Sequence, residues 1–428
     1  MKLLLEEVNY GDGFSDENDI FARKKLGLQL QNIILNSEDD SLVLAIDDNW
    51  GNGKTTFLKM WENELITNDV AEVIYFDAFK NDYQEDAFLA LSSAIYPRIA
   101  KEDDKQQYLE AAKNVGKFIV KAGVKIGLRA ATLGVVKDTD FEGIEDATSN
   151  AIEDPIEQLI EDKLKGAEKE EEIIQHFKNT ISTLAADKKI IFIIDELDRA
   201  RPDFSLDLLE KMKHVFNTKN LFFVLAVNKD QYLHIINKRY GNIDSETYLG
   251  KFIHFWFALP RLKQESGDDI TTYTFMTYLH NKMKVDKKFG GSLKILILLL
   301  KKNNTSLRDC ERCYSLLILI TASNPPSEFE DLHAMAILTF LKVKQPKTFN
   351  NLMAGIATAD EILKSINWMN LESKHDRDIK GLILAELLSD EDLIKAMQRG
   401  DFIAHERNSG KPSRALRRIL PYFESVIL

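Results

Sequence analysis

Apolar runs and amphipathic stretches alternate along the first 260 residues of the chain. Five short apolar runs predict buried strands of a parallel sheet, at residues 42–46, 71–79, 189–195, 221–227 and 252–259. Helical patterns lie between them, as in an open α/β sheet. From residue 261 onward the apolar positions recur only with helical spacing. We therefore expect an α/β core followed by an all-helical C-terminal region over residues 261–428.

The core is interrupted between its second and third strands. Residues 84–188 show no strand pattern, so we expect a helical insert there and assign residues 1–83 and 189–260 to the core. Residues 138–172 carry a strong excess of acidic residues, with 14 Asp and Glu against 3 Lys. Within the insert a basic residue also recurs at every fourth position, which predicts a basic stripe along one helix. The stripe consists of Lys113, Lys117, Lys121, Lys125 and Arg129. The acidic stretch could pair with this stripe inside the insert.

The basic stripe fits a solvated helix face best, and contact with an anionic membrane surface or a phosphate backbone is the alternative. A membrane span over residues 118–136 is not expected, because three cations near its middle would each cost roughly 2.5–3.5 kcal/mol on insertion scales. A second basic segment near the C-terminus could contact DNA. It holds Arg399, Lys411, Arg414, Arg417 and Arg418.

Candidate chemistry begins where the first strand ends. Residues 47–56 are Asp-Asp-Asn-Trp-Gly-Asn-Gly-Lys-Thr-Thr, and a helical pattern follows from Phe57. Strand, loop and helix in this order predict a phosphate-binding loop, with backbone N–H groups and a helix N-terminus facing the phosphates. The glycines let the backbone approach a ligand closely. The nucleotide contacts that we expect come from Asn49, Trp50, Gly51, Asn52, Gly53, Lys54, Thr55 and Thr56.

Two residues of this loop have specific expected roles, and one departs from the motif. Lys54 is expected to reach the β- and γ-phosphates, and the Thr55 hydroxyl to be a ligand of Mg²⁺. Asp48 stands at the first glycine of the general pattern G-x-x-x-x-G-K-[ST]. A carboxylate beside phosphates is unfavourable unless it points away or meets a cation. Asp48 could therefore weaken the affinity of the loop for a nucleotide.

A pair of acids ends the third strand. A buried apolar run precedes Asp195 and Glu196, which places both carboxylates at the edge where open α/β sheets bind ligands. Asp195 is expected to hold Mg²⁺, often through water, and Glu196 to orient and deprotonate the attacking water. Downstream of the phosphate loop, this acid pair favours a nucleotide hydrolase over a chance Gly-x-Gly-Lys-Thr turn.

Further polar residues follow the neighbouring strands. Asn228 ends the fourth strand and could contact both the γ-phosphate and the attacking water, whereas an asparagine that only caps the strand end is the alternative. Asp77 ends the second strand beside the loop.

The negative charge that builds up in the transition state of nucleotide hydrolysis also needs a cation to stabilise it. We consider Arg199, Arg201 and Arg239 as a finger from a neighbouring subunit, and Arg308 as a sensor from the helical region.

Composition and charge limit the class of protein. The formal charge of −12 and the pI near 5.3 argue against global, non-specific binding of nucleic acid. The first apolar stretch is too short for a secretory signal, so we expect a cytoplasmic protein that is at most peripheral to the inner membrane. Cys310 and Cys313 lack a second ligand pair, which predicts reduced side chains on a helix rather than a zinc site.

Taken in order, these motifs resemble the KAP family of P-loop NTPases over about residues 20–320. The resemblance is carried by Trp-Gly-Asn-Gly-Lys-Thr at 50–55, Phe-Asp-Ala-Phe at 76–79 and Ile-Asp-Glu-Leu-Asp-Arg at 194–199. It continues with Pro202, Phe-Val-Leu-Ala-Val at 223–227, Tyr-Leu-Gly-Lys-Phe at 248–252, Leu-Pro at 259–260, and Leu-Arg at 307–308 with Arg312. The resemblance implies an ATPase core of the additional-strand, catalytic-glutamate type. It also implies an insert between the two nucleotide motifs, which in many members spans the membrane.

We therefore expect a Mg²⁺-dependent ATPase, with ATP and Mg²⁺ as cofactors, whose hydrolysis drives a conformational or oligomeric switch. A role in prokaryotic defence against phage is implied by the family resemblance alone. An arginine finger in trans would make the protein a homo-oligomer, and a defence system would supply a partner protein. The alternative is a nucleotide-locked scaffold, favoured by Asp48, that barely hydrolyses ATP and recruits a partner or a membrane surface.

Overall fold

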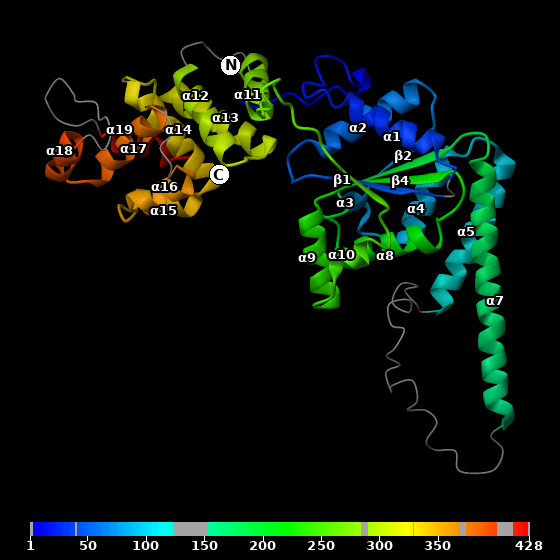
Figure 1. Ribbon diagram of the computed structural model, residues 1–428. Coiled ribbons are helices and arrows are strands. Elements are labelled where there is room, and N and C mark those ends of the chain that lie inside the picture. The colour runs from blue at the N-terminus through cyan, green and yellow to red at the C-terminus, as the bar shows by residue number, and fades with distance from the viewer. Residues whose placement is uncertain are drawn as a thin grey trace.

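A parallel sheet forms the centre of the core (Figure 1). The computed structural model describes residues 3–38, 41–122, 153–283, 290–327, 329–368, 374–399 and 414–426. Its five strands correspond to the five apolar runs and pair in parallel, as predicted, and their order in the sheet is β2-β3-β4-β1-β5. They are β1 (Val43–Asp47), β2 (Glu72–Asp77), β3 (Ile190–Asp195), β4 (Leu221–Val227) and β5 (Phe255–Ala258).

Helices cover both faces of this sheet (Figure 1). In β3, Ile191 and Ile193 pack toward one face, while Ile190, Phe192 and Ile194 pack toward the other. A strand that is buried on both faces requires the continuous apolar run that the sequence shows. The covering helices are α1 (Lys24–Asn36) and α2 (Lys54–Thr67) on one face, and α4 (Ala87–Ile95), α8 (Pro202–His214) and α9 (Lys229–Tyr240) on the other.

The fifth strand is shorter than predicted. β5 begins at Phe255, three residues after the expected start. The N–H groups of Phe252 and Ile253 donate to the carbonyl oxygen of Leu249, at 3.0 and 3.2 Å, and so close the turn after α10 (Ser245–Leu249). Their apolar side chains are buried in the core without being part of the sheet, which explains the longer apolar run.

The first helix also begins later than predicted. The apolar residues between Ile20 and Leu30 recur with helical spacing and predict a helix from near Asp19, but α1 begins at Lys24. The carboxylate of Asp19 accepts the N–H groups of Arg23 and Lys24, at 2.7 and 2.8 Å, and Ala22 has a φ of 53°, outside the helical region. Residues 14–22 therefore lie in turns, which places them beside the phosphate loop.

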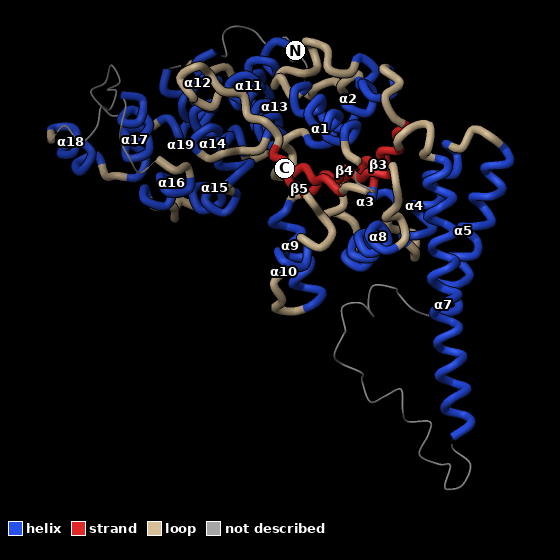
Figure 2. Tube along the Cα trace, turned by 45° about the vertical axis from the view of Figure 1, so that its right-hand side comes forward, coloured by secondary structure: helices blue, strands red, loops and turns tan. Residues whose placement is uncertain are grey.

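The insert forms a helical arm. α5 (Glu102–Ala122) and α7 (Glu153–Leu184) lie side by side and project away from the sheet (Figures 1 and 2). The 32 residues of α7 span about 48 Å. At the base of the arm, the rings of Phe88, Phe177 and Phe216 lie 5.2–5.7 Å apart between centroids. The described part of the insert is helical, as predicted, and its base packs into the core of the sheet.

The basic stripe lies partly on this arm. Lys113 and Lys117 are exposed on α5, as a solvated helix face requires. Lys125 and Arg129, like the acidic residues 138–152, lie outside the described residues, so pairing between the two stretches stays a prediction. No helix within the described ranges combines the length and the apolar character needed to cross a bilayer.

The described part of the C-terminal region is built of helices from Thr271 onward, as predicted, whereas residues 261–270 form a linker with an antiparallel bridge between Lys263 and Asp269. The helices pack around one apolar core, to which Phe21 of the N-terminal turns also belongs. Cys310 and Cys313 are buried and free in α13 (Leu307–Ser323), and burial raises the pKa of both thiols. The helices are α11 (Thr271–Lys282), α12 (Gly290–Lys302), α13 (Leu307–Ser323), α14 (Phe329–Lys344), α15 (Pro346–Met353), α16 (Ala359–Ser365), α17 (Lys374–Leu387), α18 (Asp390–Gln398) and α19 (Ala415–Ile419).

The basic residues near the C-terminus hold this region together. Arg414 donates hydrogen bonds to carbonyl oxygens at the end of α17. Arg417 pairs with Glu386 at 2.9 Å, and Arg418 pairs with Asp331. These contacts account for the three arginines without a nucleic acid, and DNA binding stays a prediction.

Candidate functional site

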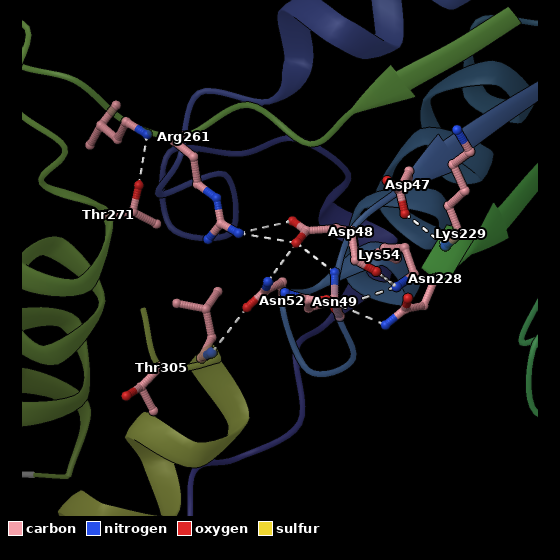
Figure 3. A network of polar contacts seen from close by, with 12 residues as sticks. Asp47, Asp48, Asn49, Asn52, Lys54, Asn228, Lys229, Arg261, Thr271 and Thr305 are labelled. Atoms are coloured by element: carbon pink, nitrogen blue, oxygen red, sulfur yellow. Dashed lines mark hydrogen bonds and ion pairs between the residues drawn. The ribbon is translucent and has the colours of Figure 1, made fainter. Parts of the chain in front are cut away.

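The phosphate loop runs from Asp48 to Gly53, between β1 and α2 (Figure 3). Gly51 and Gly53 have φ values of 81° and 88°, a backbone conformation that favours glycine. A Cβ on Gly51 would also lie 2.7 Å from the Cβ of Arg308, so glycine is needed for space as well. α2 begins at Lys54, which places the first N–H groups of the helix at the loop.

Lys54 is buried under its own loop, with 8% of its surface exposed. Its Nζ donates to the backbone carbonyl oxygens of Asp48 and Asn49 (Figure 3). Burial lowers the pKa of Lys54, while the nearby carboxylates of Asp198 and Asp48 act in the opposite direction. The ammonium group therefore has carbonyl partners that a phosphate oxygen could replace.

Asp195 and Glu196 lie at the end of β3, where the sheet meets the loop. Asp195 is 2% exposed and held from two sides, because its Oδ1 accepts the N–H of Glu196 at 2.8 Å and its Oδ2 accepts the hydroxyl of Tyr75 at 2.7 Å. Both acids line one pocket together with Lys54 and Thr55, as predicted from their positions in the sequence. The pocket thus brings a cation, a hydroxyl group and two carboxylates together.

Glu196 is paired within its own chain. Its Oε1 lies 2.7 Å from Nη1 of Arg199, whose guanidinium carbon lies 5.7 Å from the ring centroid of Trp50. Burial raises the pKa of Glu196, and the adjacent Arg199 opposes that rise. Arg199 therefore lines the pocket of its own chain, and its role as a finger for a neighbouring subunit stays a prediction.

Asp198 is a site residue for which the sequence analysis predicted no role. It is 5% exposed, and its Oδ2 accepts the indole N–H of Trp50 and the backbone N–H of Asn228, the latter at 3.0 Å. It therefore joins the loop to the ends of β3 and β4. Its position in Asp-Glu-Leu-Asp-Arg, three residues after Asp195, is the signal that could have identified it.

Asn228 caps α9 and also contacts the phosphate loop. Its Oδ1 accepts the N–H of Gln231 at 3.2 Å and caps α9. Its Nδ2 donates to Oδ1 of Asn49 at 3.4 Å (Figure 3). The capping role is present in the structure, whereas contact with a γ-phosphate stays a prediction.

The pocket has a second, more apolar part that sequence reasoning missed. Residues 18–21 line it from the N-terminal turns, and Phe275 and Tyr278 line it from α11. Aromatic and aliphatic side chains beside a phosphate loop suit a flat nucleobase. The sequence predicts a helix from near Asp19 that packs on the edge of the core, which gave no reason to expect residues 18–21 beside a ligand.

Asp48 meets a cation, which is one of the two conditions under which a carboxylate is tolerated here. Its Oδ1 lies 3.0 Å from Nη2 of Arg261 and accepts a hydrogen bond of 2.5 Å from Nδ2 of Asn52 (Figure 3). Arg261 is 213 positions away in the sequence and follows the last strand. No local pattern could have indicated this partner.

The remaining candidates fall into two groups. Arg308 lines the pocket, and its backbone N–H donates to the carbonyl oxygen of Gly51 at 3.0 Å. Arg201 and Arg239 are exposed and lie outside the lining of this pocket. Asp77 caps α3 (Ala78–Asn81) and pairs with Lys80 at 3.1 Å, so helix capping accounts for it.

Most residues of this pocket lie within a segment that matches a known protein family. A family model described as the KAP family P-loop domain matches residues 23–324, which is more than two thirds of the chain. This chain belongs to the KAP family. The match includes the phosphate loop, the acid pair, the arm and the first helices of the C-terminal region. No curated protein matches this KAP-family chain in sequence.

Two solved structures are similar to this KAP-family chain. Cdc6p from Pyrobaculum aerophilum is 11% identical, with a TM-score of 0.41, and the match covers 98% of this chain and 97% of that one. PCH-2 from C. elegans is also 11% identical, with a TM-score of 0.31 and coverage of 81% and 71%. Membership of the family makes this chain a nucleotide-binding protein of the P-loop NTPase class.

The residues present in this KAP-family chain fit a nucleotide and a divalent cation. Lys54 offers a buried cation, and Thr55 and Asp195 line the same pocket. Within the described residues no group of three or more His, Cys, Asp or Glu side chains could hold a metal ion alone. Beside nucleotides, Mg²⁺ is usually held by one or two protein ligands together with phosphate oxygens, and Thr55 and Asp195 could supply those ligands.

Proposed function

We propose that this chain is a Mg²⁺-dependent ATPase that uses ATP binding and hydrolysis to switch its conformation or its oligomeric state. The observation that carries the proposal is the convergence of Lys54, Thr55, Asp195 and Glu196 on one pocket. Phosphoryl transfer to water requires a phosphate-binding cation, ligands for Mg²⁺ and a residue that positions the water. Each of these is supplied by a residue that the sequence motifs single out.

Binding would replace contacts that the loop now makes with itself. Lys54 would exchange the carbonyl oxygens of Asp48 and Asn49 for phosphate oxygens. Thr55 and Asp195 would hold Mg²⁺, with Asp195 kept in orientation by the Tyr75 hydroxyl. When bound, Mg²⁺ would neutralise charge on the phosphate oxygens. Arg308, which lines the same pocket from α13, would sense the phosphates from the helical region.

Glu196 would act as the general base toward water. Burial already raises the pKa of its carboxyl group, which brings a base nearer to the pH at which it works. In the structure its Oε1 is engaged by Arg199, so Glu196 must leave this ion pair, or share it, to accept a proton from water. Exposed Arg201 and Arg239 are free of the pocket and could serve a neighbouring subunit in a homo-oligomer.

The ion pair between Glu196 and Arg199 also favours a second candidate function. A chain whose base is held by its own arginine would bind ATP and hydrolyse it slowly, as a nucleotide-locked scaffold that recruits a partner protein or a membrane surface. The two candidate functions differ in the rate of ATP hydrolysis, not in the binding of ATP.

The experiment that tests the proposal is ATP turnover measured over a range of protein concentrations, with Mg²⁺ and with excess EDTA. We expect turnover that rises faster than linearly with protein, because a finger from a neighbour requires assembly. Lys54→Ala and Glu196→Gln should abolish it. Lack of turnover, combined with ATP-induced thermal stabilisation of wild type but not of Lys54→Ala, would favour the scaffold.

The biological setting that we propose is the prokaryotic cytoplasm and defence against phage, on the ground of family membership. Plaque counts on cells that express wild type or Lys54→Ala test it. Equal plaque counts for both, across a phage panel, would contradict this setting.

A further inference from the structure

Asp48 is built into the phosphate loop rather than merely tolerated there. Its side chain is 8% exposed. Its Oδ1 accepts hydrogen bonds from the N–H of Asn49 at 2.7 Å, from Nδ2 of Asn52 at 2.5 Å and from Nη2 of Arg261 at 3.0 Å (Figure 3). Glycine, the residue that the motif specifies here, could make none of these contacts.

Arg261 connects this carboxylate to the linker between the core and the helical region. It follows β5 and precedes α11 by ten residues. The next residue, Leu262, donates its N–H to Oγ1 of Thr271, the first residue of α11, at 2.8 Å (Figure 3). A movement of Asp48 would therefore be transmitted to the start of the helical region.

A second connection reaches the same part of the loop. Asn52, whose Nδ2 is bound to Asp48, accepts the N–H of Leu307 on its Oδ1 at 3.3 Å. The neighbouring Gly51 accepts the N–H of Arg308 at 3.0 Å. The amide of Asn52 thus bridges Asp48 and the first turn of α13, so the two connections to the helical region are joined by the hydrogen bond between Asn52 and Asp48.

Two further contacts make Asp48 sensitive to what occupies the pocket. The Nζ of Lys54 donates to the carbonyl oxygen of Asp48, and a phosphate that draws Lys54 away would remove this bond. Arg23 is 2% exposed, and its Nη1 donates to the carbonyl oxygen of Asn52 at 3.0 Å. The charge of Asp48 therefore balances both Arg23 and Arg261, which would otherwise repel each other beside the loop.

We propose that Asp48 and Arg261 are positioning residues that couple occupancy of the nucleotide pocket to the placement of the C-terminal helical region. The departure from the motif then has a use, because the first loop residue gains a carboxylate through which the helical region responds to the loop. This inference rests on ATP binding, as proposed above, but not on hydrolysis.

The test is amide hydrogen exchange over residues 259–271 and the first turn of α13, measured with and without ATP. In wild type we expect ATP to change the exchange rates about tenfold, within the usual range of coupling between two sites. Asp48→Asn and Arg261→Gln should each reduce this response to less than about twofold, and the double variant should do no worse than either, since both remove one interaction. Arg261→Lys keeps the cation and should restore most of the response.

Lys282→Gln is the matched control. It removes an ion pair of 3.1 Å between α11 and Glu17, which also joins the helical region to the N-terminal part of the chain but does not touch the loop. This variant should keep the full response to ATP. ATP binding by calorimetry, together with an unchanged exchange response in Asp48→Asn and Arg261→Gln, would overturn the coupling alone. Absence of ATP binding in wild type would overturn the proposed function and the coupling with it.

Discussion

The core and the C-terminal helical region use their buried charges differently. In the core, Lys54, Asp195 and Glu196 gather where parallel strands end, and they line a pocket. In the helical region, Asp331 and Glu386 are buried between helices and are matched by Arg418 and Arg417. The same residue types therefore line a pocket in one region and join packed helices in the other. What separates the two arrangements is whether the charges face a pocket or face each other between helices.

The largest expected effect concerns the core. Glu196→Gln removes the proposed base but keeps its size, so turnover should fall by about 10²–10⁴-fold, as expected for loss of a general base. ATP binding by calorimetry should remain, because Lys54 and the loop are unchanged. Thermal melting of the variant serves as the folding control. Turnover within about threefold of wild type would show that Glu196 is not the general base. The difference between the charges of the core and those of the helical region would then be smaller than proposed.

In the helical region the expected effect is on stability. Arg418→Ala removes the guanidinium group that pairs with buried Asp331, so the free energy of unfolding should drop by about 3 kcal/mol. Urea denaturation followed by circular dichroism measures this change. As a control, Lys188→Gln removes an exposed pair with Asp69 and should cost less than about 1 kcal/mol. Equal costs for the two variants would show that burial does not decide the worth of these pairs.

A smaller effect is expected in the pH profile of the ATPase. Arg199 lowers the pKa of Glu196, against the rise that burial causes. A base works only when deprotonated, so activity should be lost as the pH falls through this pKa. Arg199→Gln should raise the pKa and move the acid limb of kcat to higher pH. A limb that stays in place, or moves to lower pH, would contradict the pairing of Arg199 with the base.

The smallest effect is expected on the arm. Lys113 and Lys117 are exposed on α5, so replacing both with Gln should change stability by less than about 0.5 kcal/mol. Flotation with anionic vesicles at low and high salt tests the alternative role at a membrane surface. Salt-sensitive flotation of wild type that is lost in the double variant would show that the basic stripe binds an anionic membrane surface. The stripe would then resemble the charges of the core, which are proposed to bind a nucleotide.

The sequence was sufficient for features that depend on local patterns. Continuous apolar runs gave the strands, because the inner strands β1, β3 and β4 are buried on both faces, whereas the edge strand β5 is partly exposed. The loop and the acid pair were predicted because a phosphate site needs few residue types at fixed spacing. The predicted boundaries of the first helix, the second strand and the last strand were wrong. Asp19 accepts the N–H groups of Arg23 and Lys24, Ala78 and Phe79 already belong to α3, and the residues after α10 form a turn.

Features that depend on distant contacts could not be predicted. The partner of Asp48 lies after the last strand, and the aromatic residues of the pocket come from α11. The basic segment near the C-terminus illustrates the same limit, because only the fold shows that Arg418 faces a buried carboxylate. A cluster of charged residues in a sequence therefore indicates an external binding partner only once the contacts of those residues within the chain are known.

The position of Trp50 gives this protein an intrinsic optical probe. The chain contains four tryptophans, of which Trp61 and Trp368 are 1% exposed and so are shielded from water. Trp50, at 42% exposed, lies in the phosphate loop, with its indole N–H on Asp198 and Arg199 above its ring. A ligand that enters the pocket must change the surroundings of this indole. Its emission can therefore follow loading and release of the site in real time, without an attached dye.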